Sequence, residues 1–422
     1  MNTTSAPSMA NRTGHSKPPA AARVVLGMLQ RLQKGQLALT LPDGHSQLIQ
    51  GQQSGDTSAP GAALHAHIHV SDWGLFRRVL QSGDIGLAES YMAGEWQTND
   101  LSAVLTLLIA NRDVLEQAVY GSFWGSLLYR IKHAFNRNSR KGSARNIHAH
   151  YDLGNAFYAE WLDPSMSYSS AWFEDGNRDA PLEPAQHAKV RRALYEAGVQ
   201  QGDRVLEIGC GWDSLARTAA QEFGAHVTGV TLSTEQLAWA QERLQKDGLT
   251  QSCDLRLQDY RDLPREFEQK PFDAVVSVEM FEAVGREYWD SYFDTLSRCL
   301  KPGGLACIQS ITIRDDLFDR YMKSTDFIQQ YIFPGGLLPS IAEFEALAQR
   351  HGFVVERRLA FGKDYAETLR RWHQRFNLRE ARVRELGFDE RFLRVWRFYL
   401  SYCEAAFTEG NTDVVQFTLR RS

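Results

Sequence analysis

The feature that most constrains this chain is an apolar stretch that runs directly into a glycine turn, Val205-Leu-Glu-Ile-Gly-Cys-Gly-Trp-Asp213. Glycine has no Cβ and accepts a positive φ, so the backbone of such a turn can approach a ligand closely. In the residues that follow, short apolar segments alternate with amphipathic ones. This alternation is typical of an α/β fold, whose mainly parallel sheet binds ligands at the carboxyl ends of its strands. We therefore expect a ligand at this turn.

The residues of the turn narrow the choice of ligand. A dinucleotide-binding fingerprint needs a third glycine where this chain has Ser214, and a phosphate-binding loop needs Gly-Lys-Ser/Thr, which the turn lacks. Glu207 lies two residues before Gly209. An acid in this place suits a ligand with a cationic amino-acid end better than it suits a pyrophosphate. The pattern favours S-adenosylmethionine (SAM).

Polar residues at the ends of successive predicted strands support the same ligand. Strands are expected at 204–208, 226–232, 254–258 and 272–279, and a fifth follows Lys301-Pro-Gly-Gly304. Helices are expected at 214–223 and from a Ser233/Gln236 capping box to near Gly248. Each polar residue alone also has a structural explanation, as a turn, a loop cap or a core side chain. The expected SAM contacts are Glu207, Gly209, Gly211, then Thr231 and Gln236 where the usual ribose-binding acid is missing, then Asp259 and Tyr260 beside the adenine.

Composition and charge set the domain plan. The chain has 422 residues with 43% hydrophobic and 23% charged content, typical of a soluble protein of two or three domains. A net charge of -4 gives no argument for a nucleic-acid partner, and five scattered cysteines without ligand spacing predict no metal site and a reducing, cytoplasmic setting. We expect a disordered segment (1–19), a small N-terminal domain (20–115), a basic linker (116–145) and a catalytic domain (146–422).

The basic linker has two possible interpretations. Between Ala118 and Tyr151 the sequence holds no Asp or Glu, and the apolar residues Trp124, Leu127, Leu128, Ile131 and Phe135 share one helical face. Such a helix can lie in the headgroup layer of an anionic membrane. It can equally be an interdomain helix followed by a solvated linker. No apolar run is long enough to span a bilayer, so we expect peripheral contact at the inner face of the membrane.

Beyond residue 60 the chain resembles the cyclopropane fatty acid synthases, including the mycolic acid cyclopropane synthases and related fatty-acyl methyltransferases. The resemblance implies a Rossmann-like SAM-dependent methyltransferase fold with a small N-terminal lipid-associated domain, and SAM contacts from Tyr168 and Ser169 near the methionine end. The motifs that carry it are Gly86–Trp96, 150–155, Met166-Ser-Tyr-Ser169, the glycine turn, Thr231–Gln236, Gln258–Asp262, Met280-Phe-Glu282, Tyr331–Gly336 and Asp364-Tyr365.

The resemblance also implies a chemistry and a base. An alkene attacks the methyl group of SAM, and the resulting carbocation loses a proton from the new methyl group to close a cyclopropane. In the family the base is a bicarbonate ion held by a Glu, a Tyr, a His and main-chain groups near a Cys and an Ile. The matching positions here are Glu282, Tyr365, Gln309, Ser170 and Ile311, so that Gln replaces the His and Ser replaces the Cys.

These matches leave alternatives open. Glu282 alone would be read as a carboxylate at a helix start, and Glu279 in the same loop could share either role. Tyr365 opens a core-like stripe with Leu369, Trp372 and Phe376. Losing the imidazole removes a group that can carry positive charge, although the Gln309 amide can still donate to an anion.

The sequence therefore predicts a SAM-dependent cyclopropane-fatty-acyl-phospholipid synthase. One alternative is a methyltransferase that gives methylene- or methyl-branched chains, and a second is a catalytically silent lipid-binding relative. The expected partners are unsaturated phospholipids, an anionic membrane surface and a second copy of the chain in a homodimer.

Overall fold

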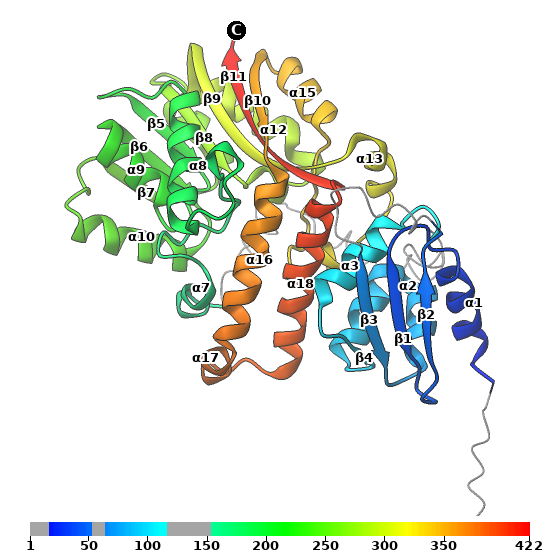
Figure 1. Cartoon of the computed structure of the whole chain (residues 1–422). Coiled ribbons are helices and arrows are strands. Elements are labelled where there is room, and N and C mark those ends of the chain that lie inside the picture. The colour runs from blue at the N-terminus through cyan, green and yellow to red at the C-terminus, as the bar shows by residue number, and fades with distance from the viewer. Residues whose placement is uncertain (1–16, 53–63, 116–152) are drawn as a thin grey trace, which may run out of the picture.

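The computed structural model describes residues 17–52, 64–115 and 153–422. A small N-terminal unit and a larger catalytic unit lie side by side, and helices α16 and α18 run between them (Figure 1). The expected disordered segment 1–19, apart from residues 17–19, and the expected basic amphipathic helix in 116–145 fall outside the described residues.

The N-terminal unit is a four-stranded sheet covered by helices. Its strand order is β2-β1-β3-β4, with β1 antiparallel to β2 and parallel to β3. Buried residues alternate with partly buried ones along β1 and with exposed or partly buried ones along β3, so one face of the sheet packs on the core. The elements are α1 (Ala20–Leu29), β1 (Gln36–Thr40), β2 (Ser46–Gln50), β3 (His65–Val70), α2 (Gly74–Met92), β4 (Trp96–Gln97) and α3 (Leu101–Ala110).

The catalytic unit is built on a seven-stranded sheet in the order β10-β11-β9-β8-β5-β6-β7. Strands β5 to β9 are parallel, which confirms the predicted Rossmann-like arrangement. The C-terminal β11 was not predicted, and it lies antiparallel between β9 and β10. The strands are β5 (Arg204–Ile208), β6 (His226–Thr231), β7 (Cys253–Leu257), β8 (Phe272–Val278), β9 (Leu300–Ile313), β10 (Phe353–Ala360) and β11 (Thr412–Arg421).

Helices cover both faces of this sheet. One apolar layer holds α8 (Leu182–Glu196), α9 (Ser214–Phe223) and α10 (Thr234–Lys246). The other holds α11 (Leu263–Phe267), α12 (Trp289–Cys299) and α15 (Ile341–Arg350). The predicted helix at 214–223 is confirmed to the residue.

The start of α10 confirms half of the predicted capping box. The hydroxyl of Ser233 accepts a hydrogen bond from the Gln236 backbone N–H. The returning bond from the Gln236 side chain is replaced, because the Ser233 N–H donates to Thr231 Oγ1 at 3.1 Å. Thr231 thereby ties the end of β6 to the start of α10.

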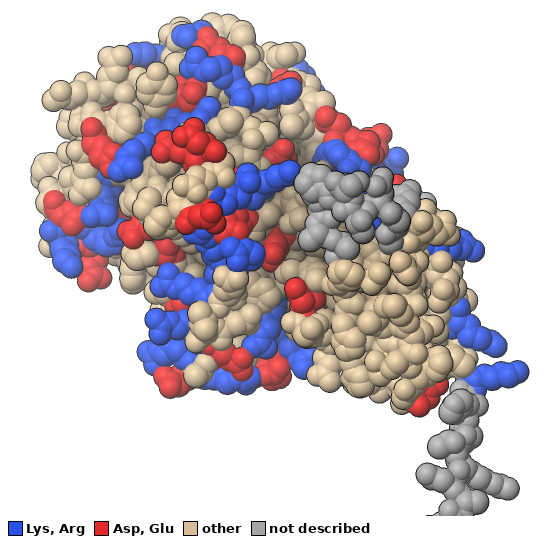
Figure 2. Space-filling view, in the orientation of Figure 1, with Lys and Arg blue, Asp and Glu red and all other residues tan. Residues whose placement is uncertain are grey.

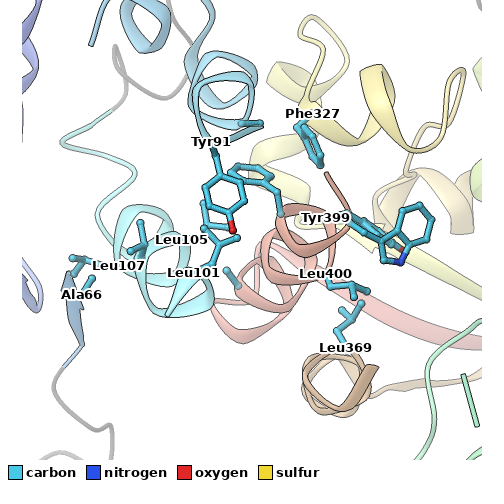
Figure 3. Packing of buried hydrophobic residues seen from close by; sticks show 14 of the residues in the cluster. Ala66, Tyr91, Leu101, Leu105, Leu107, Phe327, Leu369, Tyr399 and Leu400 are labelled. Atoms are coloured by element: carbon cyan, nitrogen blue, oxygen red, sulfur yellow. The ribbon is translucent and has the colours of Figure 1, made fainter. Parts of the chain in front are cut away.

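One hydrophobic core joins the two units. Helix α18 (Glu390–Thr408) packs against α16 (Gly362–Leu378) on one side and against α2 and α3 on the other. Figure 3 shows Tyr91 and Leu105 of the N-terminal unit on one side of α18, and Leu400 on its other side beside Leu369 of α16. The remaining described α-helices are α7 (Asn155–Trp161), α13 (Asp315–Tyr321), α14 (Phe327–Tyr331) and α17 (Glu380–Glu385).

Candidate active site

A cavity of about 330 Å³ lies at the carboxyl ends of the central strands. Its walls come from the turns after β5, β6, β7 and β8, and from α14, α16 and α18. Eight of the nine predicted SAM contacts line it: Tyr168, Ser169, Glu207, Gly209, Gly211, Thr231, Gln236 and Tyr260.

The glycine turn has the backbone that its sequence predicts. Gly209 and Gly211 have φ values of 88° and 49°, in the region that favours glycine. A Cβ on Gly209 would lie 2.9 Å from Met280 Cγ, whereas a Cβ on Gly211 would meet no atom of any residue other than its chain neighbours within 4 Å. Gly209 therefore allows close packing of the turn, and Gly211 keeps its approach to the cavity open.

Glu207 is prepared for a cationic partner. Its side chain is 4% exposed, and no described residue donates a hydrogen bond to its Oε2. Burial and the neighbouring Asp213 raise the pKa of the Glu207 carboxyl to about 8. A buried carboxylate oxygen without a partner is unfavourable, so a positively charged ligand group would stabilise it. The residues present therefore fit the amino-acid end of SAM.

Asp259 lies differently from the prediction. It is absent from the cavity lining, which instead includes Gln258, Tyr260 and Arg261. The carboxylate of Asp259 accepts two hydrogen bonds from the Arg261 guanidinium, at 2.8 and 2.5 Å, and a third from the Arg261 backbone. The chain turns back at residues 260–262, which brings the arginine onto the acid. The described contacts therefore pair this carboxylate with Arg261, and its contact with the adenine stays a prediction.

Glu279 lies in the middle of the part of the cavity that holds the residues implied for the base, away from the glycine turn. It follows β8 directly and has a φ of 49°, which is uncommon for a residue with a side chain. Its Oε1 accepts from the Ser170 backbone N–H at 2.8 Å and from Gln309 Nε2 at 2.7 Å. Its Oε2 accepts from the Tyr365 hydroxyl at 2.7 Å. Three donors from distant parts of the chain thus converge on one carboxylate.

Glu282 lies beside this carboxylate but makes different contacts. Its Oε1 accepts a hydrogen bond from the Ile311 backbone N–H, and no described residue donates to its Oε2. Burial and the nearby Glu279 raise the pKa of Glu282 to about 8. Two neighbouring carboxyl groups in an apolar site do not both ionise easily. We assign the proton to Glu282, because Glu279 is the group that three donors surround.

The groups implied for bicarbonate are therefore already engaged. Ser170, Gln309 and Tyr365 donate to Glu279, while Ile311 and Glu282 bind each other. An added anion at this donor set would meet the Glu279 carboxylate instead of free donors. These residues do not fit a bound bicarbonate ion.

Much of the remaining wall is aromatic. Tyr365 was predicted to be either a core residue or a site residue. It is both, since it is buried in the apolar stripe of α16 and also lines the cavity. The hydroxyls of Tyr168 and Tyr399 lie 2.8 Å apart. The sequence did not single out the residues of α18, because their spacing is that of any buried helix face. The aromatic lining residues are Tyr168, Trp212, Tyr260, Tyr321, Phe333, Tyr365, Tyr399, Tyr402 and Phe407.

Lys189 is a further cavity residue that the sequence did not indicate. Its side chain is 1% exposed, and its ammonium donates to the Ser169 hydroxyl. Burial lowers the pKa of Lys189 to about 8, while Glu279 and other acids oppose that shift. A buried cation therefore lies among the acids of the site and offsets part of their charge.

Comparisons with known proteins agree with this geometry. The family model described as mycolic acid cyclopropane synthetase matches residues 138–417. Tuberculostearic acid methyltransferase UfaA1 of Mycobacterium tuberculosis is 41% identical, over 87% of this chain and 86% of the relative. Cyclopropane-fatty-acyl-phospholipid synthase of Escherichia coli is 37% identical, over 84% of this chain and 88% of the relative.

Solved structures show the same catalytic fold. Mycolic acid cyclopropane synthase CmaA1, complexed with SAH and CTAB, has a TM-score of 0.60 and 32% identity, and the match covers 66% of this chain and 98% of that one. Cyclopropane synthase MmaA2 from Mycobacterium tuberculosis has the same TM-score with 31% identity and the same coverage. The chain has this fold, its glycine turn fits SAM, and the family model matches most of its length. It therefore belongs to the mycolic acid cyclopropane synthetase family of SAM-dependent enzymes.

Proposed function

We propose that this protein transfers the methyl group of SAM to the cis double bond of unsaturated phospholipid acyl chains and closes a cyclopropane ring. The observation that carries the proposal is the single cavity that joins the predicted SAM contacts to an apolar, aromatic wall. A polar substrate would need hydrogen-bonding groups on that wall. An alkene needs none, and it reacts through a carbocation that π faces can stabilise by about 2 kcal/mol or more each when desolvated.

The N-terminal unit supports a lipid substrate. A second cavity of about 220 Å³ lies between it and the catalytic unit, and its lining is mainly Leu, Ile, Val and Phe. Both cavities are lined by Tyr321, Asp326, Leu338, Tyr402, Ala406 and Thr412, so they adjoin. An acyl chain with a mid-chain double bond must place apolar carbons on both sides of the reacting atoms. The adjoining cavity offers space for one of these ends.

A methylene- or methyl-branched product is the second candidate. It shares the methyl transfer and differs only in which proton the cation loses after a hydride shift. The similarity to a tuberculostearic acid methyltransferase favours it, as does the difference at the base end of the site, where Gln309 replaces the His of the family pattern.

Contact with the membrane surface belongs to the same proposal. No helix in the described ranges is long and apolar enough to cross a membrane. In the view of Figure 2 the N-terminal unit shows few charged side chains, whereas the catalytic unit shows many of both signs. The basic residues of 116–145 are proposed to bind anionic lipid, with a homodimer as the assembly. Reversing Lys132, Arg137 and Arg140 to Glu should weaken binding to anionic vesicles, and equal binding would return this segment to a linker role.

The deciding experiment is product analysis. The purified protein is incubated with SAM and vesicles of a phospholipid with cis-unsaturated chains, and the recovered acyl chains are examined by proton NMR. Cyclopropane protons resonate far upfield of alkene and methyl signals, so a ring is distinguished from a methylene branch of equal mass. An exocyclic-methylene signal without a cyclopropane signal would replace the ring-forming proposal by the branching one. SAM binding without any turnover would support a silent relative.

A further inference from the structure

Glu279 stands at a backbone position that a side chain rarely occupies. It is one of four non-glycine residues with positive φ in the described chain, and it comes directly after β8 at the edge of the cavity. Glycine would adopt the same conformation without strain. Strained positions of this kind cluster at active sites, where the surrounding structure holds them in place. The glutamate side chain therefore needs an explanation at the site.

Its contacts suggest that explanation. The three donors come from the loop before α8, from β9 and from α16, and they occupy both oxygens of one carboxylate. Gln309 is itself held, because its Oε1 accepts from Gln416 Nε2 of β11 at 2.9 Å. Gln309 and Ser170 are fully buried, and Tyr365 is 5% exposed. The carboxylate is thus fixed by a rigid shell while it faces the cavity.

We infer that Glu279 is the proton acceptor of the reaction and that its carboxylate takes the place of the bicarbonate ion expected from the resemblance. The inference rests on the proposed function and names the base for it. Three of the five groups implied for bicarbonate are the ones that hold Glu279. The Glu279 carboxylate is thus a built-in anion at the place where the resemblance implies a bound bicarbonate ion.

The chemical steps balance with this base. The alkene electron pair forms a bond to the methyl carbon, the carbon–sulfur bond breaks, and its electron pair stays on sulfur to give S-adenosylhomocysteine. A carbocation remains on the neighbouring chain carbon. A C–H bond of the new methyl group then breaks, its electron pair closes the ring, and the proton passes to a Glu279 oxygen. That proton leaves to solvent after product release, which restores the carboxylate.

The hydrogen bonds also limit a side reaction. A free carboxylate would capture the cation as an ester, because it is a nucleophile as well as a base. In Glu279 each oxygen already accepts at least one hydrogen bond, which draws off charge and fixes the side chain in one position. Burial raises the pKa of Glu279, so it accepts a proton more readily than an exposed glutamate, and Lys189 and the three donors oppose this shift.

The test compares two variants with a matched control. Glu279→Gln keeps the size of the side chain and removes its basicity, and Glu279→Gly opens the site in a backbone conformation that glycine accepts. Glu242→Gln, at an exposed position of α10, controls for the loss of one negative charge. Methyl transfer from SAM to cis-unsaturated phospholipid vesicles is measured in bicarbonate-depleted buffer, with and without added sodium bicarbonate. SAM affinity and Tm are measured for each variant.

We expect wild type and Glu242→Gln to be active and indifferent to bicarbonate. Glu279→Gln should lower kcat by about 100-fold or more, the usual contribution of a general base, with SAM affinity unchanged. Glu279→Gly should be equally slow and should regain activity when bicarbonate fills the vacated space. That rescue would not follow from a merely structural role.

Two results would overturn the inference alone: a wild type that needs bicarbonate, or a Glu279→Gln variant with normal kcat. A folded Glu279→Gly variant that bicarbonate does not rescue would also count against it. A wild type that transfers no methyl group under any condition would instead overturn the proposed function.

Discussion

The two ends of the active-site cavity are built in different ways. At the cofactor end, most of the predicted contacts lie at strand ends and are held by one strand–turn–helix unit, as Glu207 is in β5 and Gly209 and Gly211 are between β5 and α9, while Tyr168 and Ser169 come from the loop before α8. At the base end, Glu279 is held by residues from three separate segments. The cofactor end is therefore local in sequence, whereas the base end exists only after the sheet, α16 and the loop before α8 have packed together.

The two carboxylates should also fail in different ways. Glu207 lacks a described partner at Oε2, and we expect it to bind the cationic end of SAM. Glu279 accepts hydrogen bonds from several donors, and we expect it to accept the proton of the reaction. Replacing Glu207 by Gln should therefore change the affinity for SAM, and replacing Glu279 by Gln should change kcat.

The largest effect on binding is expected for Glu207→Gln. Removing one partner of a buried, charged contact usually costs about 2–5 kcal/mol, which corresponds to a rise in the SAM Kd of roughly 30-fold or more. Calorimetry gives the Kd, and kcat at saturating SAM should stay within a few-fold of wild type. If kcat collapsed while the Kd stayed constant, the division of the cavity into two ends would be wrong.

A pair of substitutions at Gly211 tests whether SAM passes close to this glycine. Gly211→Ala should destabilise the fold by roughly 1–2 kcal/mol, because φ is 49° and a Cβ is disfavoured there. Gly211→Leu carries the same backbone penalty but extends into space where a Cβ meets no residue other than its chain neighbours within 4 Å. We expect SAM affinity to fall about tenfold further in the Leu variant, with similar Tm values. Equal Kd values for the two variants would show that the ligand does not pass this glycine.

The pH dependence of SAM binding should report on Glu207. Its pKa of about 8 in the free protein means that the carboxyl is protonated at pH 6 and must lose its proton to meet a cation. Affinity should therefore rise with pH between 6 and 8, by at most about tenfold per unit. Glu207→Gln should flatten this dependence. A wild-type Kd that is constant over this range would contradict an ionic contact at Glu207.

The smallest effect concerns a third buried acid, which lies at the interdomain cavity. Asp84 accepts from the Tyr402 hydroxyl at 2.9 Å and from the Phe327 backbone, and burial raises its pKa to about 6. Because the folded state holds this proton more tightly than the unfolded chain, stability falls as pH rises from about 4 to 6.

Asp84→Asn keeps an oxygen acceptor and removes the charge. The variant should match wild type near pH 4 and be more stable by on the order of 1 kcal/mol at pH 7. Thermal or denaturant unfolding of both proteins at each pH measures the difference. A variant less stable than wild type at pH 7 would show that the ionised carboxylate supports the interface.

The sequence by itself determined the cofactor end. Strands β5, β6, β7 and β8 were predicted within one residue at each end, and α9 to the residue, because buried parallel strands and capped helices leave local patterns. The positive φ values of Gly209 and Gly211 followed from the residue type. Asp259 shows the limit of this reasoning, because a neighbouring arginine engages the acid and the spacing did not reveal it.

Only the tertiary structure decided which acid stands at the base end. In sequence Glu279 and Glu282 are equivalent acids in one loop, and the family pattern pointed to Glu282. The φ of Glu279 directs its side chain to Tyr365, 86 residues later in the chain, and to Gln309, whose own position depends on β11. Likewise, the cavity face of α18 looks like any buried helix face until α16 and the N-terminal unit pack against it. The cofactor end depends on residues that are neighbours in the sequence, so the sequence predicts it. The base end depends on contacts between distant residues that form only when the chain folds.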